Sequence, residues 1–328
     1  MLQFIIRRLM LFIPMLFLMS MLSFALIQAP PGDYLTDYIA AQEAMGDFSA
    51  RGDMESLKHQ FGLDKPLYVQ YLKWIRGVVT WNMGVSLEFQ QPVTALLNER
   101  LLMTVVLIIF TIVFTWSMAV PIGIISAVKQ YSIIDYGFTF LSYLGVGTPN
   151  FLLALVMMWF ALSIFGLNVT GLFSVEYIDA PWSLGKVVDM LKHIWVPMLI
   201  LGTDGTARLT RIVRANLLDE LTKPYVETAR AKGLPEWKVI LKYPVRLGLN
   251  PFVSTAGLEL ANAFGGSLIV ATVMSLPTIG PLLLRALLSQ DMFMAGSLVL
   301  ITTVLVQIGV LLSDIALAMM DPRIRIQG

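Results

Sequence analysis

The chain has 328 residues, of which 57% are hydrophobic and 14% are charged. Soluble globular proteins carry about 25% charged residues, so this composition excludes an ordinary cytosolic enzyme and a disordered chain. The 23 basic and 22 acidic residues give a net charge of +1, which excludes a bulk attraction to nucleic acid. With no cysteine and two histidines, disulfides and thiolate sites are excluded, and a histidine-built metal site has almost no ligands. The composition predicts an integral membrane protein.

Six segments are long and apolar enough to cross a bilayer, because a helix needs about 20 residues to span a core about 30 Å thick. The predicted spans are residues 9–29, 101–128, 136–165, 194–214, 251–273 and 292–320. The first follows Arg7 and Arg8, as the apolar core of a signal peptide would. This run is longer than a signal peptide's, and Gln28-Ala29-Pro30-Pro31 is a poor cleavage site, so we expect a retained anchor.

The basic residues predict the orientation of these spans. Arg7, Arg8, Lys129 and the basic residues of 208–246 and 323–325 flank the spans on one side, which the positive-inside rule assigns to the cytoplasm. The predicted fold is therefore an all-α integral membrane protein with six transmembrane helices and both termini in the cytoplasm. We divide it into residues 1–100, a first helix with a long external loop, and residues 101–328, a five-helix core with a cytoplasmic loop at about 215–250.

Polar groups inside the predicted spans are candidates for function, since ionisable residues are costly in a bilayer. Asp204 and Arg208 are four positions apart on one helix face, so they either pair with each other or line a pathway. Glu259 and Asn262 share a face of the fifth span, and no basic residue lies near Glu259 in the sequence. We therefore favour a polar pathway lined by Glu259 and Asn262, with Asp204 as a further candidate. The stretch 145–150, Gly-Val-Gly-Thr-Pro-Asn, predicts a kink in the third span that serves packing.

The predicted cytoplasmic loop contains residues that typically begin and end two short helices. Pro224 suits the first turn of a helix, and Gly233 suits the cap at its end. A second helix begins at Pro235 and ends before Pro244. This is more order than a mere connection requires.

The charges and small residues of the first of these helices allow two interpretations. Glu227 lies in its first turn, and Arg230 and Lys232 lie near its end, so the charges complement the helix dipole. The dipole does not explain the small residues, which leave a low surface that another backbone can approach closely: Ala229, Ala231 and Gly233. The helix either only connects two spans or docks against a partner.

The segment Glu227-Thr-Ala-Arg-Ala-Lys-Gly233 resembles the EAA loop of permease subunits in ATP-binding-cassette (ABC) importers. The whole chain resembles, more narrowly, the dipeptide/oligopeptide/nickel permease family, on the side of the first of its two permease paralogues. Four other segments carry this resemblance, in the expected order: Pro31-Gly-Asp33, Phe61-Gly-Leu-Asp-Lys-Pro-Leu-Tyr-Val-Gln-Tyr71, Thr148-Pro-Asn-Phe151 and Asp321-Pro-Arg-Ile-Arg325.

The resemblance implies the fold of a type I ABC importer permease and a function in the uptake of di- and oligopeptides, with oligosaccharides or nickel chelates as alternatives. The helix at 224–233 would be the coupling helix, seated in a separate ATPase subunit. The residues implied in that contact are Glu227, Thr228, Ala229, Arg230, Ala231, Lys232 and Gly233. The implied partners are a second homologous permease, two ATP-binding-cassette ATPase subunits, a periplasmic solute-binding protein and membrane lipid.

The chain lacks the Gly-x-x-x-x-Gly-Lys-Ser/Thr phosphate loop, so we expect it to be non-catalytic and without a cofactor, with ATP and magnesium bound by the ATPase subunits. The alternative of another class is an ion-coupled secondary transporter, with Asp204, Glu259 and Asp314 as ion sites. A single set of six spans without an evident inverted repeat, together with the ordered loop, argues against it. No Gly-x-Ser-x-Gly or His-Glu-x-x-His motif is present, which argues against a membrane enzyme.

Overall fold

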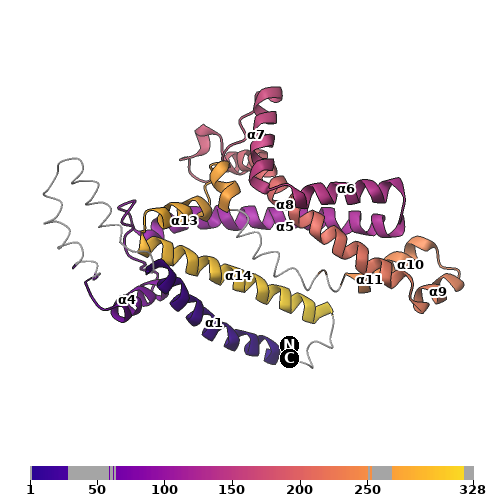
Figure 1. Ribbon diagram of the computed structural model, residues 1–328, viewed down its shortest axis with the longest axis horizontal. Helices are drawn as coiled ribbons and strands as arrows, with labels where there is room; N and C mark the ends of the chain where they lie inside the picture. Colours follow the sequence, from indigo (N-terminus) through magenta and orange to yellow (C-terminus); the bar gives the residue numbers. More distant parts are fainter. Residues whose placement is uncertain are drawn as a thin grey trace. The chain divides into compact units, whose positions relative to one another are not determined.

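The computed structural model of the chain describes residues 2–28, 59, 62, 64–249, 252 and 268–320 (Figure 1). Within these ranges the regular secondary structure is helical, apart from an isolated antiparallel bridge between Val85 and Pro92. The elements are α1 (Leu2–Gln28), α4 (Leu67–Val79), α5 (Val93–Val128), α6 (Ile133–Gly147), α7 (Asn150–Phe165), η1 (Val175–Tyr177), α8 (Leu184–Leu221), α9 (Pro224–Ala231), α10 (Glu236–Lys242), α11 (Pro244–Gly248), α13 (Ile279–Leu288) and α14 (Met292–Met320).

Three helices of the described ranges are long and apolar enough to cross a membrane: Ile5–Ala25 within α1, α5 itself, and Met292–Met319 within α14. The pair α6 and α7 adds a fourth if it is one broken span. The predicted sixth span agrees with α14, and the predicted second span is part of the longer α5. The predicted fifth span, 251–273, lies largely outside the described residues.

The third predicted span consists of two helices rather than one. α6 and α7 meet at an angle of 104°, with Thr148 and Pro149 between them. A residue before proline avoids the helical region, and Thr148 accordingly has extended angles of φ −98° and ψ 121°. Proline also lacks the N–H that would continue the hydrogen-bond ladder, so it begins a new helix instead. The kink predicted at 145–150 is confirmed in position.

The fourth predicted span, 194–214, lies within the longer helix α8, which runs from Leu184 to Leu221. Its charged first turns look like a loop in the sequence, yet the side chain of Ser183 caps the helix by accepting from the backbone N–H of Lys186 at 3.2 Å. The buried ammonium of Lys186 donates to the carbonyls of Ile178, at 3.2 Å, and Ala180, at 2.6 Å. These partners offset the cost of burying a charge, so the helix can begin earlier than its apolar part.

Contacts divide the chain into two compact units. The first comprises Met1–Ile6, Val105–Pro277 and Ile308–Gly328, and the second comprises Arg7–Thr104 and Thr278–Gln307. The boundary that the sequence suggests near residue 100, between a first helix with its loop and a five-helix core, stays a prediction.

In the first unit, α8 approaches its neighbours closely at three glycines. A Cβ atom on Gly123 of α5 would lie 2.7 Å from Cβ of Val213, and one on Gly202 of α8 would lie 2.6 Å from Cδ1 of Phe114. A Cβ atom on Gly145 of α6 would lie 3.1 Å from Cγ2 of Thr203. Small residues at a helix contact let two backbones pack without a gap, which is a main source of helix association in membranes. α8 is therefore held against both α5 and α6.

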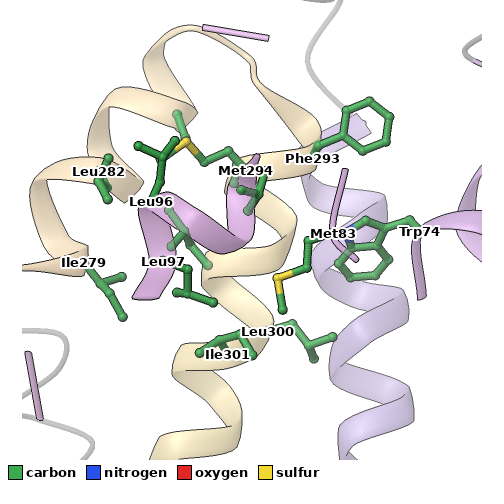
Figure 2. Close-up of a cluster of buried hydrophobic side chains, with 14 of the residues drawn as sticks. Trp74, Met83, Leu96, Leu97, Ile279, Leu282, Phe293, Met294, Leu300 and Ile301 are labelled. Carbon is green, nitrogen blue, oxygen red and sulfur yellow. The ribbon is translucent and has the colours of Figure 1, made fainter. Parts of the chain in front are cut away.

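In the second unit, apolar side chains from α4, α5, α13 and α14 form one cluster. Figure 2 labels Trp74, Met83, Leu96, Leu97, Ile279, Leu282, Phe293, Met294, Leu300 and Ile301 as members of this cluster. The fully buried carboxylate of Asp291 joins the loop that contains Ser86 to the start of α14. It accepts from the hydroxyl of Ser86 at 2.5 Å and from the backbone N–H of Met294 at 3.1 Å, which caps the helix.

Replacing Gly123 or Gly202 with alanine should destabilise the first unit by about 1–3 kcal/mol, because neither site has room for a methyl group. Gly137→Ala on α6 is the matched control, since its added Cβ would meet no atom within 4 Å. The melting temperature of the detergent-purified protein measures the difference. We expect a lower value for the two crowded sites only, and an equal shift at Gly137 would contradict the close packing of α8.

Candidate functional site

The predicted cytoplasmic loop is a folded element that follows directly on α8. We call residues 222–248, which contain α9, α10 and α11, the α9–α11 loop; its three helices follow the C-terminal end of α8 (Figure 1). Pro224 occupies the first turn of α9, where its missing N–H costs nothing. Gly233 has a φ of +74°, the left-handed conformation that closes a helix and that side chains disfavour. The predicted roles of Pro224 at the start and Gly233 at the end of this helix are both confirmed.

The α9–α11 loop has a small apolar core of its own. Val226 and Ala229 of α9 pack with Val239 of α10, and all three are buried. Tyr225, Leu234 and Tyr243 cover them. α9 and α10 are too short to be stable alone, so this shared burial is what holds them as helices.

Two polar contacts tie the α9–α11 loop together at its surface. Arg230 donates to the Glu236 carboxylate at 2.7 Å, and its hydrogen bond lowers the pKa of Glu236. The Tyr225 hydroxyl donates to the carboxylate of Glu220 in the last turn of α8. Burial, and then this hydrogen bond, raise the pKa of Tyr225. Exposed pairs such as Arg230–Glu236 add little stability, so the apolar core contributes more to holding α9 and α10 together.

The structure divides the seven residues of the predicted docking segment between surface and interior. Ala229 is 5% exposed and faces α10, so its small size serves packing inside the α9–α11 loop. The other six are exposed: Glu227, Thr228, Arg230, Ala231, Lys232 and Gly233. The low surface that the sequence suggested is therefore made by Ala231 and Gly233 without Ala229.

Glu227 differs from Arg230 in having no hydrogen-bonded partner among the described residues of the α9–α11 loop. Its carboxylate makes no hydrogen bond or ion pair with any residue that the structure describes, whereas Arg230 is held by Glu236. An exposed acidic group at the start of a helix, beside a flat patch of small residues, is available to a hydrogen-bond donor on another chain. The geometry thus supports docking in addition to dipole compensation.

Of the candidate pathway residues, the structure describes Asp204 but not Glu259 or Asn262. Arg208 donates to Asp204 on the same face of α8, as the pairing alternative predicted, and both side chains are about one-third exposed, at 34% and 33%. Glu259 and Asn262 lie outside the described residues. The pathway role of all three stays a prediction.

The side chains of Asp135 and Arg214, which no sequence motif indicates, form an ion pair at 2.8 Å across 79 positions. Asp135 is 2% exposed and lies in the first turn of α6. The one local signal was a capping serine, Ser132, which accepts from the backbone N–H of Asp135 at 3.2 Å. Nothing in the local sequence indicates that Arg214 is its partner.

Replacing Ala229 with leucine should loosen the α9–α11 loop, because overfilling a packed apolar site costs about 1–3 kcal/mol. Ala231→Leu is the matched control, since it adds the same side chain at an exposed position. Trypsin cuts after Arg230 and Lys232, so limited proteolysis of the purified protein measures the loosening. We expect faster cleavage of the Ala229 variant only. Equal cleavage of the two variants would show that Ala229 does not face inward.

Comparison with known proteins finds transport permeases as relatives that match along the chain. Residues 119–326 match the family described as binding-protein-dependent transport system inner membrane component, and residues 1–108 match the N-terminal region of such membrane components. The oligopeptide transport system permease protein AppB of Bacillus subtilis (strain 168) is 34% identical over 98% of this chain and 98% of its own. The dipeptide transport system permease protein DppB of Escherichia coli (strain K12) is 31% identical over 99% of each. The chain is a multi-pass inner-membrane protein that belongs to the family of binding-protein-dependent transport system inner membrane components.

Proposed function

We propose that this chain is a permease subunit of an ATP-driven ABC importer that takes up di- and oligopeptides delivered by a periplasmic binding protein. The observation that carries the proposal is the α9–α11 loop, which is folded around its own core yet exposes Glu227, whose carboxylate makes no hydrogen bond to any residue that the structure describes. A loop that only joins two spans needs neither feature. Relatives that match over their full length are named oligopeptide and dipeptide permeases, which supports peptides as the transported class.

The proposed fold is that of a type I importer permease with six spans and cytoplasmic termini. α1, α5, the α6–α7 pair and α14 supply four of these spans by length and apolar composition. α8 and residues 251–273 supply the other two. α8 carries more charge than a free span tolerates, but Asp204 is paired with Arg208 and Asp135 with Arg214, which lowers the cost of placing them in the membrane.

The proposed role of α9 is to dock into one of two ATPase subunits. Glu227 accepts hydrogen bonds from that subunit, and Ala231 and Gly233 let its backbone approach. Thr228 and Lys232 lie at the edge of the contact, while Ala229 and Arg230 act indirectly, through the core of the loop and through Glu236. ATP and magnesium bind to the ATPase subunits, so this chain is non-catalytic and needs no cofactor.

The translocation pathway would lie between this chain and a second, homologous permease. Glu259 and Asn262 are proposed to line it from the fifth span. Asp204 would border it as an ion pair with Arg208 and not as a free carboxylate, which suits a neutral or zwitterionic solute better than an ion site.

Replacing Glu227 with alanine should lower ATP-dependent uptake of a labelled dipeptide about tenfold, because it removes the central acceptor of the docking contact. The measurement uses the tagged chain purified from its native membranes with its partners and reconstituted in vesicles. Wild type is expected to bring down a second permease and ATPases with phosphate loops. The variant should insert normally but retain less ATPase.

Asp219→Ala is the control, because it removes an exposed carboxylate from α8 just before the α9–α11 loop. Normal uptake by the Glu227 variant at normal expression would contradict the docking role. Recovery of wild type alone, with uptake driven by an ion gradient, would instead support a secondary transporter. Uptake of an oligosaccharide or a nickel chelate, but not of peptide, would support the assignment to an ABC importer and would contradict peptides as its substrate.

A further inference from the structure

The turn between α5 and α6 is fixed to α8 by one buried carboxylate. Asp135 lies at the start of α6 and is 2% exposed. Its oxygens accept from the hydroxyl of Ser126 in α5 and, at 3.0 Å, from the backbone N–H of Tyr131 in the turn. From α8, the guanidinium of Arg214 donates through Nε and Nη2, each at 2.8 Å. A single side chain thus joins the end of α5, the turn and the start of α6 to α8, which is 79 positions away in the sequence.

This contact has the geometry of a rigid connection. A two-point bond between a planar guanidinium and a carboxylate fixes distance and orientation together, which apolar packing does not. Burying such a pair adds little or no net stability compared with apolar side chains of the same volume. Stability alone is therefore a poor explanation for a charged pair at this position.

Arg214 lies where α8 becomes the stem of the α9–α11 loop. About two helical turns separate it from Leu221, the last residue of α8, and α9 begins at Pro224. The same corner also touches the loop through apolar groups, since Ala127 of α5 is buried with Leu217 of α8, Ile240 of α10 and Val245 of α11. The α9–α11 loop thus contacts the α5–α6 corner through apolar groups that lie beside the bond between Arg214 and Asp135.

We propose that Asp135 and Arg214 are positioning residues of the transport cycle, which clamp the α5–α6 corner to the stem of the α9–α11 loop. When the ATPases move the loop, the clamp makes the ends of α5 and α6 follow α8 as one body. Without it, α8 can shift against the corner, and ATP is hydrolysed without moving the transmembrane helices. This inference rests on the proposed coupling role of α9.

The variants must separate this role from a purely structural one. Removing one partner leaves a buried charge unpaired and risks misfolding, so Asp135→Asn combined with Arg214→Gln is the main variant. Arg214→Lys keeps the charge but loses the two-point bond. Asp189→Asn is the matched control, because Asp189 is also a buried carboxylate of α8 but lies at its other end, where Ser174 donates to it at 2.7 Å.

The experiment measures ATP hydrolysed per dipeptide transported in the reconstituted complex. Both clamp variants are expected to assemble with the ATPases and hydrolyse ATP, while this ratio rises about tenfold, the size of a typical coupling between two sites. The Asp189 control should keep the wild-type ratio, whatever the amount of complex recovered.

If ATP hydrolysis and uptake fall together, in proportion to the amount of complex assembled, the proposed clamp is wrong and the pair of Asp135 and Arg214 has only a structural role. A ratio that rises equally in the Asp189 control would overturn it as well. Wild-type protein without ATP-dependent uptake would refute the proposed function itself, which is a separate result because it needs no variant.

Discussion

The close approach of α8 to α5 and α6 is the constraint on which the first unit depends. At Gly123, Gly202 and Gly145 there is no room for a further carbon atom without movement of a neighbour. Between helices surrounded by lipid, such contact supplies the attraction that the hydrophobic effect supplies in water. A helix held in this way can carry a loop at its end without losing its own position.

Three charged groups along α8 have partners of fixed geometry. Lys186 donates to two carbonyls at the N-terminal end, Asp204 accepts from Arg208 in the middle, and Arg214 holds Asp135 nearer the C-terminal end. In α9, by contrast, Glu227 is exposed and makes no hydrogen bond or ion pair with any residue that the structure describes. This exposed carboxylate is the group that we propose for docking to an ATPase subunit.

Features with local causes could be predicted from the sequence. Pro224 and Gly233 determine the ends of α9 through their own backbone chemistry, and Pro149 breaks the α6–α7 pair through its own ring. The ends of α14 also agree with the sequence, since they depend on a long apolar run.

Features with distant causes could not be predicted. The start of α8 was missed because Lys186 finds its carbonyl partners only in the folded loop. The sequence does not decide whether Ala229 is exposed or buried, because a small side chain suits both docking and packing; the contact with Val239 in the fold decides for packing. The ion pair of Asp135 and Arg214 joins residues 79 positions apart, with no pattern in between to connect them.

With the clamp of Asp135 and Arg214 intact, the α9–α11 loop, α8 and the α5–α6 corner should move as one body. Because the chain has no cysteine, spin labels can be placed without background through Lys129→Cys at the corner and Lys223→Cys at the start of α9. The distance between them, measured by pulsed electron resonance in the assembled transporter, is predicted to be the same in the nucleotide-free and ATP-bound states. A label pair from Lys129→Cys to the partner permease must change between those states, which shows that the transporter has switched. A change between Lys129→Cys and Lys223→Cys larger than about 2 Å, the size of an interface helix shift, would contradict the account.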